Sequence, residues 1–192
     1  VKPEDQPRFL NRIHQEADRL VALINDILRL SQLDEGGALP HEQVSVLELA
    51  QEAARSLTAQ AAAQAVHISV TGTAGTVFGV RRLLYEIARN LCENAVKYNV
   101  PGGSVTVEVA ETDRDVTLLV RDTGIGIPQE MLSHIYDFGF STKAAEGRGF
   151  GMSMIQNIVV RHDGTIDVDT EQGAGTTFTL IFQIKRQKEG SQ

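Results

Sequence analysis

Apolar residues in the first part of the chain recur at alternating intervals of three and four positions. This spacing predicts one long amphipathic helix over 7–34, whose apolar stripe includes Phe9, Ile13, Ala17, Leu20, Ile24 and Ile27. A glycine pair and Pro40 then end the helical pattern. We therefore expect a helical stem over 1–36, followed by a linker over 37–45. A long, two-sided helix usually pairs with other helices, and an ordinary packing helix is the alternative.

From residue 46 the pattern changes to shorter segments. Helical spacing predicts helices over 46–64, 81–98 and 149–161, with a short one near 128–136. Alternation predicts strands over 66–71, 104–111, 116–122, 165–170 and 176–185. The stretch from Gly72 to Gly79 is expected to be turn, and 188–192 a frayed tail. This order predicts an α+β fold, a two-layer α/β sandwich, over 46–187.

Composition narrows the class of protein. Of the 192 residues, 42% are hydrophobic and 22% charged, which is the balance of a globular protein. The net charge of -7 argues against nucleic acid or an anionic membrane as the main partner. The single cysteine, Cys92, falls in a helical pattern and is predicted to be a buried thiol in a reducing compartment. No apolar run approaches the roughly 20 residues that span a bilayer.

The first motif with chemical meaning lies in the predicted helix over 81–98. Asn90 and Asn94 are four residues apart, so their amide side chains share one helix face. Amide oxygens are hard ligands that suit Mg²⁺, which also takes phosphate oxygens. Lys97 and Tyr98 follow one turn later, where an ammonium group can meet a phosphate. Two surface asparagines are the alternative interpretation of this motif alone.

The second motif, Asp122-Thr123-Gly124-Ile125-Gly126-Ile127, follows a predicted strand directly. An aspartate there can accept a hydrogen bond from an exocyclic amine such as that of adenine. The glycines let the backbone turn sharply and approach a flat ring closely. A simple glycine turn is the alternative.

Two further glycine motifs follow. Gly147-Arg148-Gly149-Phe150-Gly151-Met152 opens a predicted helix, where main-chain amides and the helix dipole can bind an anion. Gly173-Ala174-Gly175-Thr176 enters the last predicted strand, and its hydroxyl can accompany the aspartate at a purine edge. Taken singly, each also fits an ordinary glycine-rich turn.

In their order and spacing, the four motifs resemble the N box and the three glycine boxes of sensor histidine kinases. The resemblance covers about 46–185 and implies the Bergerat ATP-binding fold, a mixed, mostly antiparallel sheet packed on helices. It implies ATP and Mg²⁺ as cofactors, with Asn94 and Asn90 at the metal and 128–148 as a lid. The nucleotide-binding residues that it implies are Asn94, Lys97, Tyr98, Asp122, Gly124, Gly126, Ile127, Lys143, Arg148, Gly149, Gly151, Met152 and Thr176.

The implied reaction is transfer of the ATP γ-phosphate to a histidine. The hydrolytic branches of the superfamily carry a glutamate at the position of Asn90, and an amide cannot act as a general base. Phosphoryl transfer needs mainly positioning and Mg²⁺. The expected catalytic residues are Asn90, Lys97 and, one turn earlier as an orienting group, Glu86. A non-catalytic ATP-binding module and a hydrolytic ATPase are the competing classes.

The stem resembles the second helix of the dimerisation domain of these kinases. The acceptor histidine normally lies in the first helix, in an H-[ED]-x-[RK]-x-P setting. His41-Glu42 begins like this pattern but does not continue it, and His14, His67, His134 and His162 fit no better. We therefore expect a fragment of a homodimeric, membrane-anchored sensor whose cytoplasmic part includes this chain. Its expected partners are ATP or ADP, an acceptor helix and a response-regulator receiver domain, with no nucleic acid.

Overall fold

The computed structural model describes residues 40–137 and 151–184. The predicted stem and the site residues Lys143, Arg148 and Gly149 lie outside these ranges. The chain divides into two compact units, of which the larger comprises Leu39–Ser133 and Ile155–Gln192. The smaller comprises Val1–Ala38 and His134–Met154. The following description of layers concerns the larger unit.

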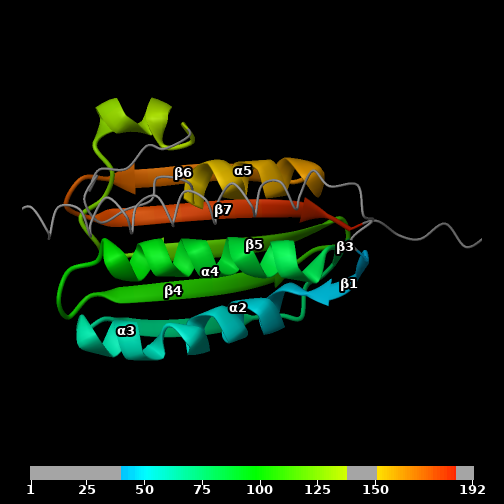
Figure 1. Cartoon of the computed structure of the whole chain (residues 1–192), viewed down its shortest axis with the longest axis horizontal. Helices are drawn as coiled ribbons and strands as arrows, with labels where there is room; N and C mark the ends of the chain where they lie inside the picture. The colour runs from blue at the N-terminus through cyan, green and yellow to red at the C-terminus, as the bar shows by residue number, and fades with distance from the viewer. Residues whose placement is uncertain (1–39, 138–150, 185–192) are drawn as a thin grey trace, which may run out of the picture. The chain divides into compact units, whose positions relative to one another are not determined.

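Five strands form the main sheet in the order β2-β4-β5-β7-β6 (Figure 1). They are β2 (His67–Gly72), β4 (Ser104–Glu111), β5 (Asp115–Asp122), β6 (Thr165–Glu171) and β7 (Gly175–Gln183). Only β2 and β4 pair in parallel, and the other three pairings are antiparallel. The predicted hairpin between residues 104–111 and 116–122 is confirmed as β4 and β5. The sheet is therefore mixed and mostly antiparallel, as predicted.

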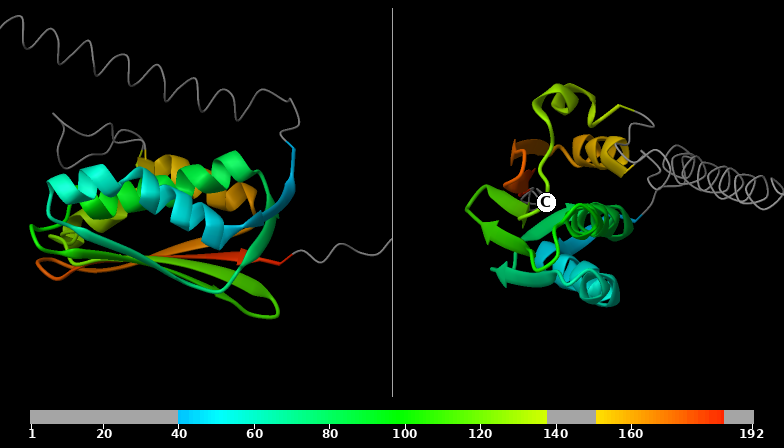
Figure 2. Two further views of the ribbon diagram at one scale, coloured as in Figure 1. Left: turned by 90° about the horizontal axis from the view of Figure 1, so that it is seen from below. Right: turned by 90° about the vertical axis from the view of Figure 1, so that its left-hand side faces the viewer.

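Helices α2 (Val46–Ser56), α3 (Thr58–Ala63) and α4 (Arg81–Lys97) cover one face of this sheet (Figure 2). α4 presents an apolar stripe because its inward residues recur every three or four positions. These residues are buried, as predicted: Leu84, Ile87, Ala88, Leu91 and Ala95. The helix contacts β4 and β5, and the inward residues of the sheet are also buried, among them Val105, Val107, Leu118 and Phe182. The predicted two-layer α+β fold is confirmed.

The helix predicted over 46–64 is two helices. It breaks at Leu57, whose backbone leaves the helical range at φ -103 and ψ 1. On either side, the Ser56 hydroxyl donates to Ala53 O at 2.7 Å and the Thr58 hydroxyl to Arg55 O at 3.0 Å. Such hydroxyl groups compete for carbonyls that a continuous helix would use. Leu57 and Ala61 are nevertheless buried together with Leu49 and Ala53, so the predicted inward face is correct.

The linker over 37–45 and the turn over 72–79 were each predicted without a strand, and both predictions are wrong in part. β1 (Glu42–Ser45) and β3 (Thr76–Gly79) pair antiparallel as a separate two-stranded sheet. Val44 and Val77 are opposite each other in this sheet and both are buried. Four-residue strands give little alternation in the sequence. Their pairing across about 30 residues of chain is what defines them.

The remaining boundaries differ little from the prediction. The short helix near 128–136 is a 3₁₀ helix, η2 (Gln129–His134). The helix predicted over 149–161 is described as α5 (Gly151–Arg161), in which Ile155 and Ile158 are fully buried. Among the residues described, no helix is both long and apolar enough to cross a membrane.

Candidate functional site

Asp122, the last residue of β5, is fixed by two main-chain amides. Its Oδ1 accepts from Gly124 N at 2.8 Å and from Thr176 N at 3.3 Å, so it joins the second and fourth predicted motifs. Burial raises the pKa of this carboxyl group, and the two hydrogen bonds oppose the rise. Because both bonds go to Oδ1, the carboxylate is oriented through one oxygen and can offer Oδ2 to a ligand.

The glycines of these motifs allow the backbone segments around Asp122 to approach each other. Gly175 has a φ of +115°, and a Cβ there would lie 2.1 Å from Asp122 O. Gly126 has a φ of +67°, and its Cβ would lie 2.1 Å from Glu171 O. At Gly124, a Cβ would come within 2.3 Å of Tyr98 O. A side chain at any of these positions would push the turn away from its neighbours.

A pair of hydroxyl groups lies beside this turn, and sequence reasoning found only one of them. Thr170 Oγ1 and Thr176 Oγ1 are 3.0 Å apart, and Ile127 N donates to Thr170 Oγ1 at 2.9 Å. Thr170 ends the inward row of β6, after Ile166 and Val168. A polar residue that continues an apolar row was the signal in the sequence that could have found it.

The N-box residues Asn90 and Asn94 are half-buried on α4. Asn90 Nδ2 donates to Glu86 O at 2.7 Å, which leaves the amide oxygen of Asn90 as its ligand atom. Glu86 therefore meets Asn90 through its main chain, whereas its side-chain Oε2 lies 3.6 Å from Arg89 Nε. That oxygen is buried and has no hydrogen bond, because an ion pair at this distance is too long for one.

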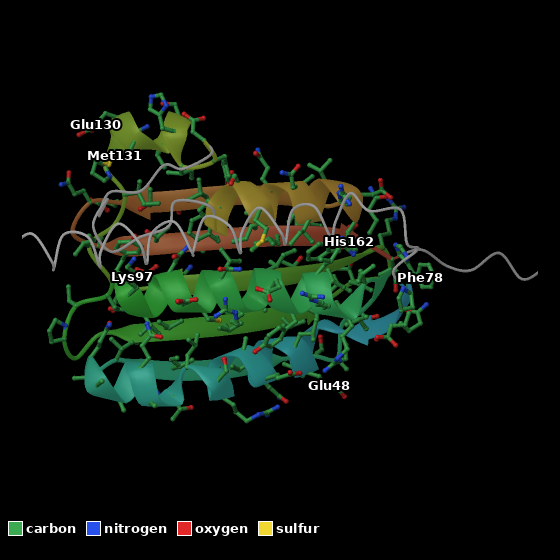
Figure 3. All side chains as sticks on the ribbon, viewed as in Figure 1. Glu48, Phe78, Lys97, Glu130, Met131 and His162 are labelled. Atoms are coloured by element: carbon green, nitrogen blue, oxygen red, sulfur yellow. The ribbon has the colours of Figure 1, made fainter. Side chains whose placement is uncertain are left out.

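Lys97 and Tyr98 are found where α4 ends. Lys97 Nζ lies 5.2 Å from the centroid of the Tyr98 ring. Figure 3 shows Lys97 at the end of α4 opposite to His162 and Phe78. The carbonyl of Tyr98 accepts from Ile125 N at 3.0 Å. This bond attaches the C-terminal end of α4, with its amide and ammonium groups, to the glycine turn after Asp122.

Asn99 is a second residue that sequence reasoning missed. Its Nδ2 donates to Ala95 O at 2.9 Å and to Ser104 O at 3.0 Å, and its Oδ1 lies 3.4 Å from Thr123 Oγ1. Thr123 Oγ1 in turn accepts from Ser104 N at 2.9 Å. Asn99 thus links α4, the start of β4 and the turn after Asp122. Its position directly after the N box was the only signal in the sequence.

The structure brings several predicted residues together within the larger unit. Asp122, Gly124 and Thr176 are in direct contact, Ile127 N donates to the hydroxyl of Thr170 beside Thr176, and Tyr98 O accepts from Ile125 N. Gly151 and Met152 begin α5 and belong to the smaller unit. Asn94 lies on α4 one turn after Asn90, as predicted.

Cys92 and His162 carry groups that can be reactive in other settings, but here both belong to the packing of the fold. Cys92 is fully buried, and burial raises its pKa to about 12, so it is an inert thiol as predicted. His162 Nε2 accepts from Val80 N at 3.1 Å, and its Nδ1 is 2.8 Å from Ile158 O. The residues that the structure describes contain no group of three or more His, Cys, Asp or Glu side chains that could hold a metal ion.

Comparisons with known proteins agree with this geometry. The family model for histidine kinase-, DNA gyrase B- and HSP90-like ATPases matches residues 79–186. The model for the His Kinase A (phospho-acceptor) domain matches residues 1–36. The heme sensor protein HssS of Staphylococcus saprophyticus is 29% identical over 178 residues, which is 92% of this chain and 39% of that protein. The chain thus spans about two fifths of the length of this relative.

Solved structures share the fold. The mycobacterial sensor histidine kinase MprB matches with 26% identity and a TM-score of 0.68, over 75% of this chain and 97% of that one. Full-length ShkA in complex with AMPPNP matches with 22% identity and a TM-score of 0.77, over 95% of this chain and 40% of that one. The fold is that of ATP-binding domains. The chain belongs to the histidine kinase-, DNA gyrase B- and HSP90-like ATPases, and it is a catalytic domain of the sensor histidine kinase kind.

Proposed function

We propose that this chain binds Mg·ATP and transfers the γ-phosphate to a histidine on an acceptor helix, for relay to a response regulator. The observation that supports this most directly is the Asp122 carboxylate, held through Oδ1 by the amides of Gly124 and Thr176. Its second oxygen can accept a hydrogen bond from the adenine amine. The complex of ShkA with AMPPNP supports an adenine nucleotide as the ligand of this fold.

The residues on α4 fit a magnesium ion. Asn90 donates its Nδ2 hydrogen to Glu86 O, so its Oδ1 is directed by a bond within its own helix. Asn94 follows on the same helix face, and two neutral oxygens are a donor set that Mg²⁺ accepts when phosphates complete its shell. When bound, the ion would neutralise charge on the phosphates. Lys97, on the same stretch of helix, would add an ammonium group to that neutralisation.

The same residues favour transfer over hydrolysis. Activating a water requires a general base beside the γ-phosphate, and Asn90 offers an amide that cannot take a proton. The two carboxylates of α4, Glu86 and Glu93, both pair with Arg89. We therefore propose that α4 positions and neutralises the phosphates, while the acceptor supplies the nucleophile. Lys143, Arg148, Gly149, Gly151 and Met152 remain proposed phosphate contacts.

The parent protein is proposed to be a homodimeric sensor, with this chain in its cytoplasmic part. The match of residues 1–36 to a phospho-acceptor domain model supports a stem that joins such a dimer. The domain limits proposed are 1–36 for the stem, 37–45 for the connection and 46–187 for the catalytic domain. A response-regulator receiver domain and an acceptor helix are its proposed partners.

The first test is calorimetric titration of ADP with Mg²⁺ into the wild type and Asp122→Ala. Loss of a hydrogen bond to a charged group is worth roughly 1.5–3 kcal/mol, so the affinity should fall about tenfold or more. Asp115→Ala is the matched control, because Asp115 begins the strand that Asp122 ends. Equal affinity in the wild type and Asp122→Ala would contradict the proposed site.

Transfer is tested separately with a supplied acceptor-helix hairpin and labelled ATP. The wild type should label the hairpin, and Asn94→Ala should label it at least about tenfold more slowly through loss of a metal ligand. Nucleotide binding without any transfer would identify a non-catalytic module. Sustained phosphate release without an acceptor would instead identify a hydrolase.

A further inference from the structure

Strand β2 forms one edge of the main sheet (Figure 2). His67 N donates to Gly103 O at 3.0 Å, on the side of β4. Main-chain groups of successive residues in a strand point to opposite sides, so the N–H and C=O groups of Ile68 and Val70 point away from β4. Among the residues that the structure describes, no strand pairs with this outward side. The edge therefore presents a row of donors and acceptors that another strand can use.

The side chains around this edge carry very little charge. Residues 56–80, which include α3, β2 and β3, contain no Asp, Glu, Lys or Arg, although these types make up 22% of the whole chain. Helix α3 contacts β2, and its Ala59, Ala62 and Ala63 are exposed. Depletion of charged residues is typical of the core of a protein–protein interface. The β2 edge and α3 together thus form an uncharged border of the larger unit.

The opposite edge of the sheet, strand β6, is different. Asp167, Asp169 and Glu171 are all exposed on it. Charged side chains on an edge strand oppose pairing with another chain, because pairing would bring like charges together. Strand β2 contains no Asp, Glu, Lys, Arg or Pro, so it lacks these protective features. Of the two edges, β2 is therefore the one that is suited to receive another strand.

A second copy of this chain fits the β2 edge. Each copy carries a net charge of -7, so two copies repel each other wherever their charged surfaces meet. That repulsion is low at β2, and a strand can pair with its own copy in the antiparallel direction about a two-fold axis. Gly72 has a φ of +128°, outside the range of a regular strand, so the pairing that avoids it is centred on Ser69.

We propose that the β2 edge is an interface between two copies of this chain, whose β2 strands pair antiparallel about an axis at Ser69. Ile68 of each copy then exchanges main-chain hydrogen bonds with Val70 of the other, and the two Ser69 residues are opposite each other. Ser69 is level with Thr106, which alternates with the buried residues of β4, so both side chains are on the open face of the sheet. The interface uses no residue of the nucleotide site and does not depend on the proposed function.

Disulfide trapping of Ser69→Cys tests this contact directly. It reports the edge itself, whereas the mass of the chain also depends on the stem, which is proposed to join a dimer. In the proposed pairing the two Cα atoms at position 69 are about 4.5 Å apart, a separation that a disulfide can span. Under mild oxidation of the whole chain, Ser69→Cys should form a cross-linked dimer at least about tenfold faster than Thr165→Cys.

Thr165→Cys is the matched control, because Thr165 is exposed on β6 at the other edge of the sheet. The native Cys92 is fully buried and should not react. Equal cross-linking of the two variants would overturn the inference. The same result is expected if the edge receives a strand of another protein, because the purified chain would then not cross-link to itself through β2.

A second variant removes the main-chain contact. Val70→Pro, added to Ser69→Cys, deletes one outward N–H and leaves the bonds to β4 in place, and proline is tolerated at such an edge position. Cross-linking should become about tenfold slower, because each copy loses one hydrogen bond to the other. Unchanged cross-linking in the folded variant would overturn the inference.

Charge variants test the same contact if Val70→Pro does not fold. Ser69→Glu and Ser69→Lys each place like charges opposite each other and should weaken self-association about threefold, measured by sedimentation. An equimolar mixture of the two variants places opposite charges there and should restore the association. The stem is the same in all three samples, and mixing cannot repair a folding defect. A mixture that associates no more than either variant alone would overturn the inference.

Discussion

The two ends of α4 are held in place by the same kind of contact but serve different purposes. At the N-terminal end, His162 Nε2 accepts from Val80 N across 82 residues of sequence. At the C-terminal end, Asn99 Nδ2 donates to Ala95 O and Ser104 O. Each is a polar side chain that forms hydrogen bonds with main-chain groups near a helix end, where such groups can lack a partner within the helix.

The two surroundings differ in burial and in what they adjoin. His162 is 7% exposed and lies next to Gly79, and its ring centroid is 6.4 Å from that of His41. Its two ring nitrogens serve main-chain groups on α5 and before α4, which leaves neither for chemistry. Asn99 is half-buried and adjoins the turn that carries Asp122. The comparison shows that a buried histidine serves the fold at one end of α4, whereas an amide side chain links the other end to the turn at Asp122.

The largest effect on stability is expected from His162→Ala. The variant leaves Val80 N–H without its partner, removes the ring's bond to Ile158 O, and opens a cavity in the core. The free energy of unfolding should fall by about 3 kcal/mol, measured by urea denaturation. His67→Ala, at an exposed strand position, is the control and should stay within about 0.5 kcal/mol of the wild type. A small loss for His162→Ala would mean that Val80 finds another acceptor.

The pH dependence of ADP binding tests the surroundings of the C-terminal end of α4, where Asp122 lies. Burial raises the pKa of Asp122 in the folded chain above the ordinary value of an aspartate, and the amine of adenine requires the ionised form as its acceptor. ADP affinity should therefore decrease as the pH falls through the raised pKa, by about tenfold when the group is protonated. In Asp122→Asn, the affinity for ADP should not show this decrease. The stability of the ligand-free fold changes with pH in the opposite direction. Because the folded state binds the proton more tightly than the unfolded state, the free energy of unfolding decreases as the pH rises above 3.8.

A smaller change in stability is expected from Asn99→Ala. Loss of its hydrogen bonds at a half-exposed helix end should lower the free energy of unfolding by about 1 kcal/mol. The affinity for ADP should fall by about tenfold, because the turn at Thr123 loses its attachment to α4. Calorimetry and urea denaturation of the same variant separate the two quantities. Asn157→Ala, on the exposed side of α5, is the control and should change neither quantity. If Asn99→Ala leaves the ADP affinity as unchanged as Asn157→Ala does, Asn99 is not part of the site.

The smallest effect is expected at an ion pair near His162. Arg81 Nη2 lies 2.8 Å from Glu52 Oε2, with both side chains nearly half exposed. Arg81→Gln should cost no more than about 0.5 kcal/mol of unfolding free energy, because solvent screens such pairs. Repeating urea denaturation at high salt should leave the difference near zero. A loss of unfolding free energy similar to that of His162→Ala would contradict the view that buried main-chain contacts contribute most of the stability at the N-terminal end of α4.

The sequence by itself determined the repeating parts of the fold. Helix α4 and strands β4 and β5 lie where the spacing of apolar residues placed them, because each buries one face along its whole length. The second and fourth motifs also pointed to Asp122 and Thr176, which a hydrogen bond joins in the structure. Glycines marked the turns, because only a residue without Cβ fits where Gly175 meets Asp122 O.

Only the tertiary structure decided which residues meet across the chain. β1 and β3 are too short to show alternation, and their pairing of Val44 with Val77 exists only after the chain has folded. Thr170 and Asn99 look like ordinary polar residues in the sequence. They become site residues because strand register and helix ends place them 3.0 Å from Thr176 and Ser104. Local periodicity is a property of the sequence, whereas a hydrogen bond between distant residues depends on how the chain brings them together.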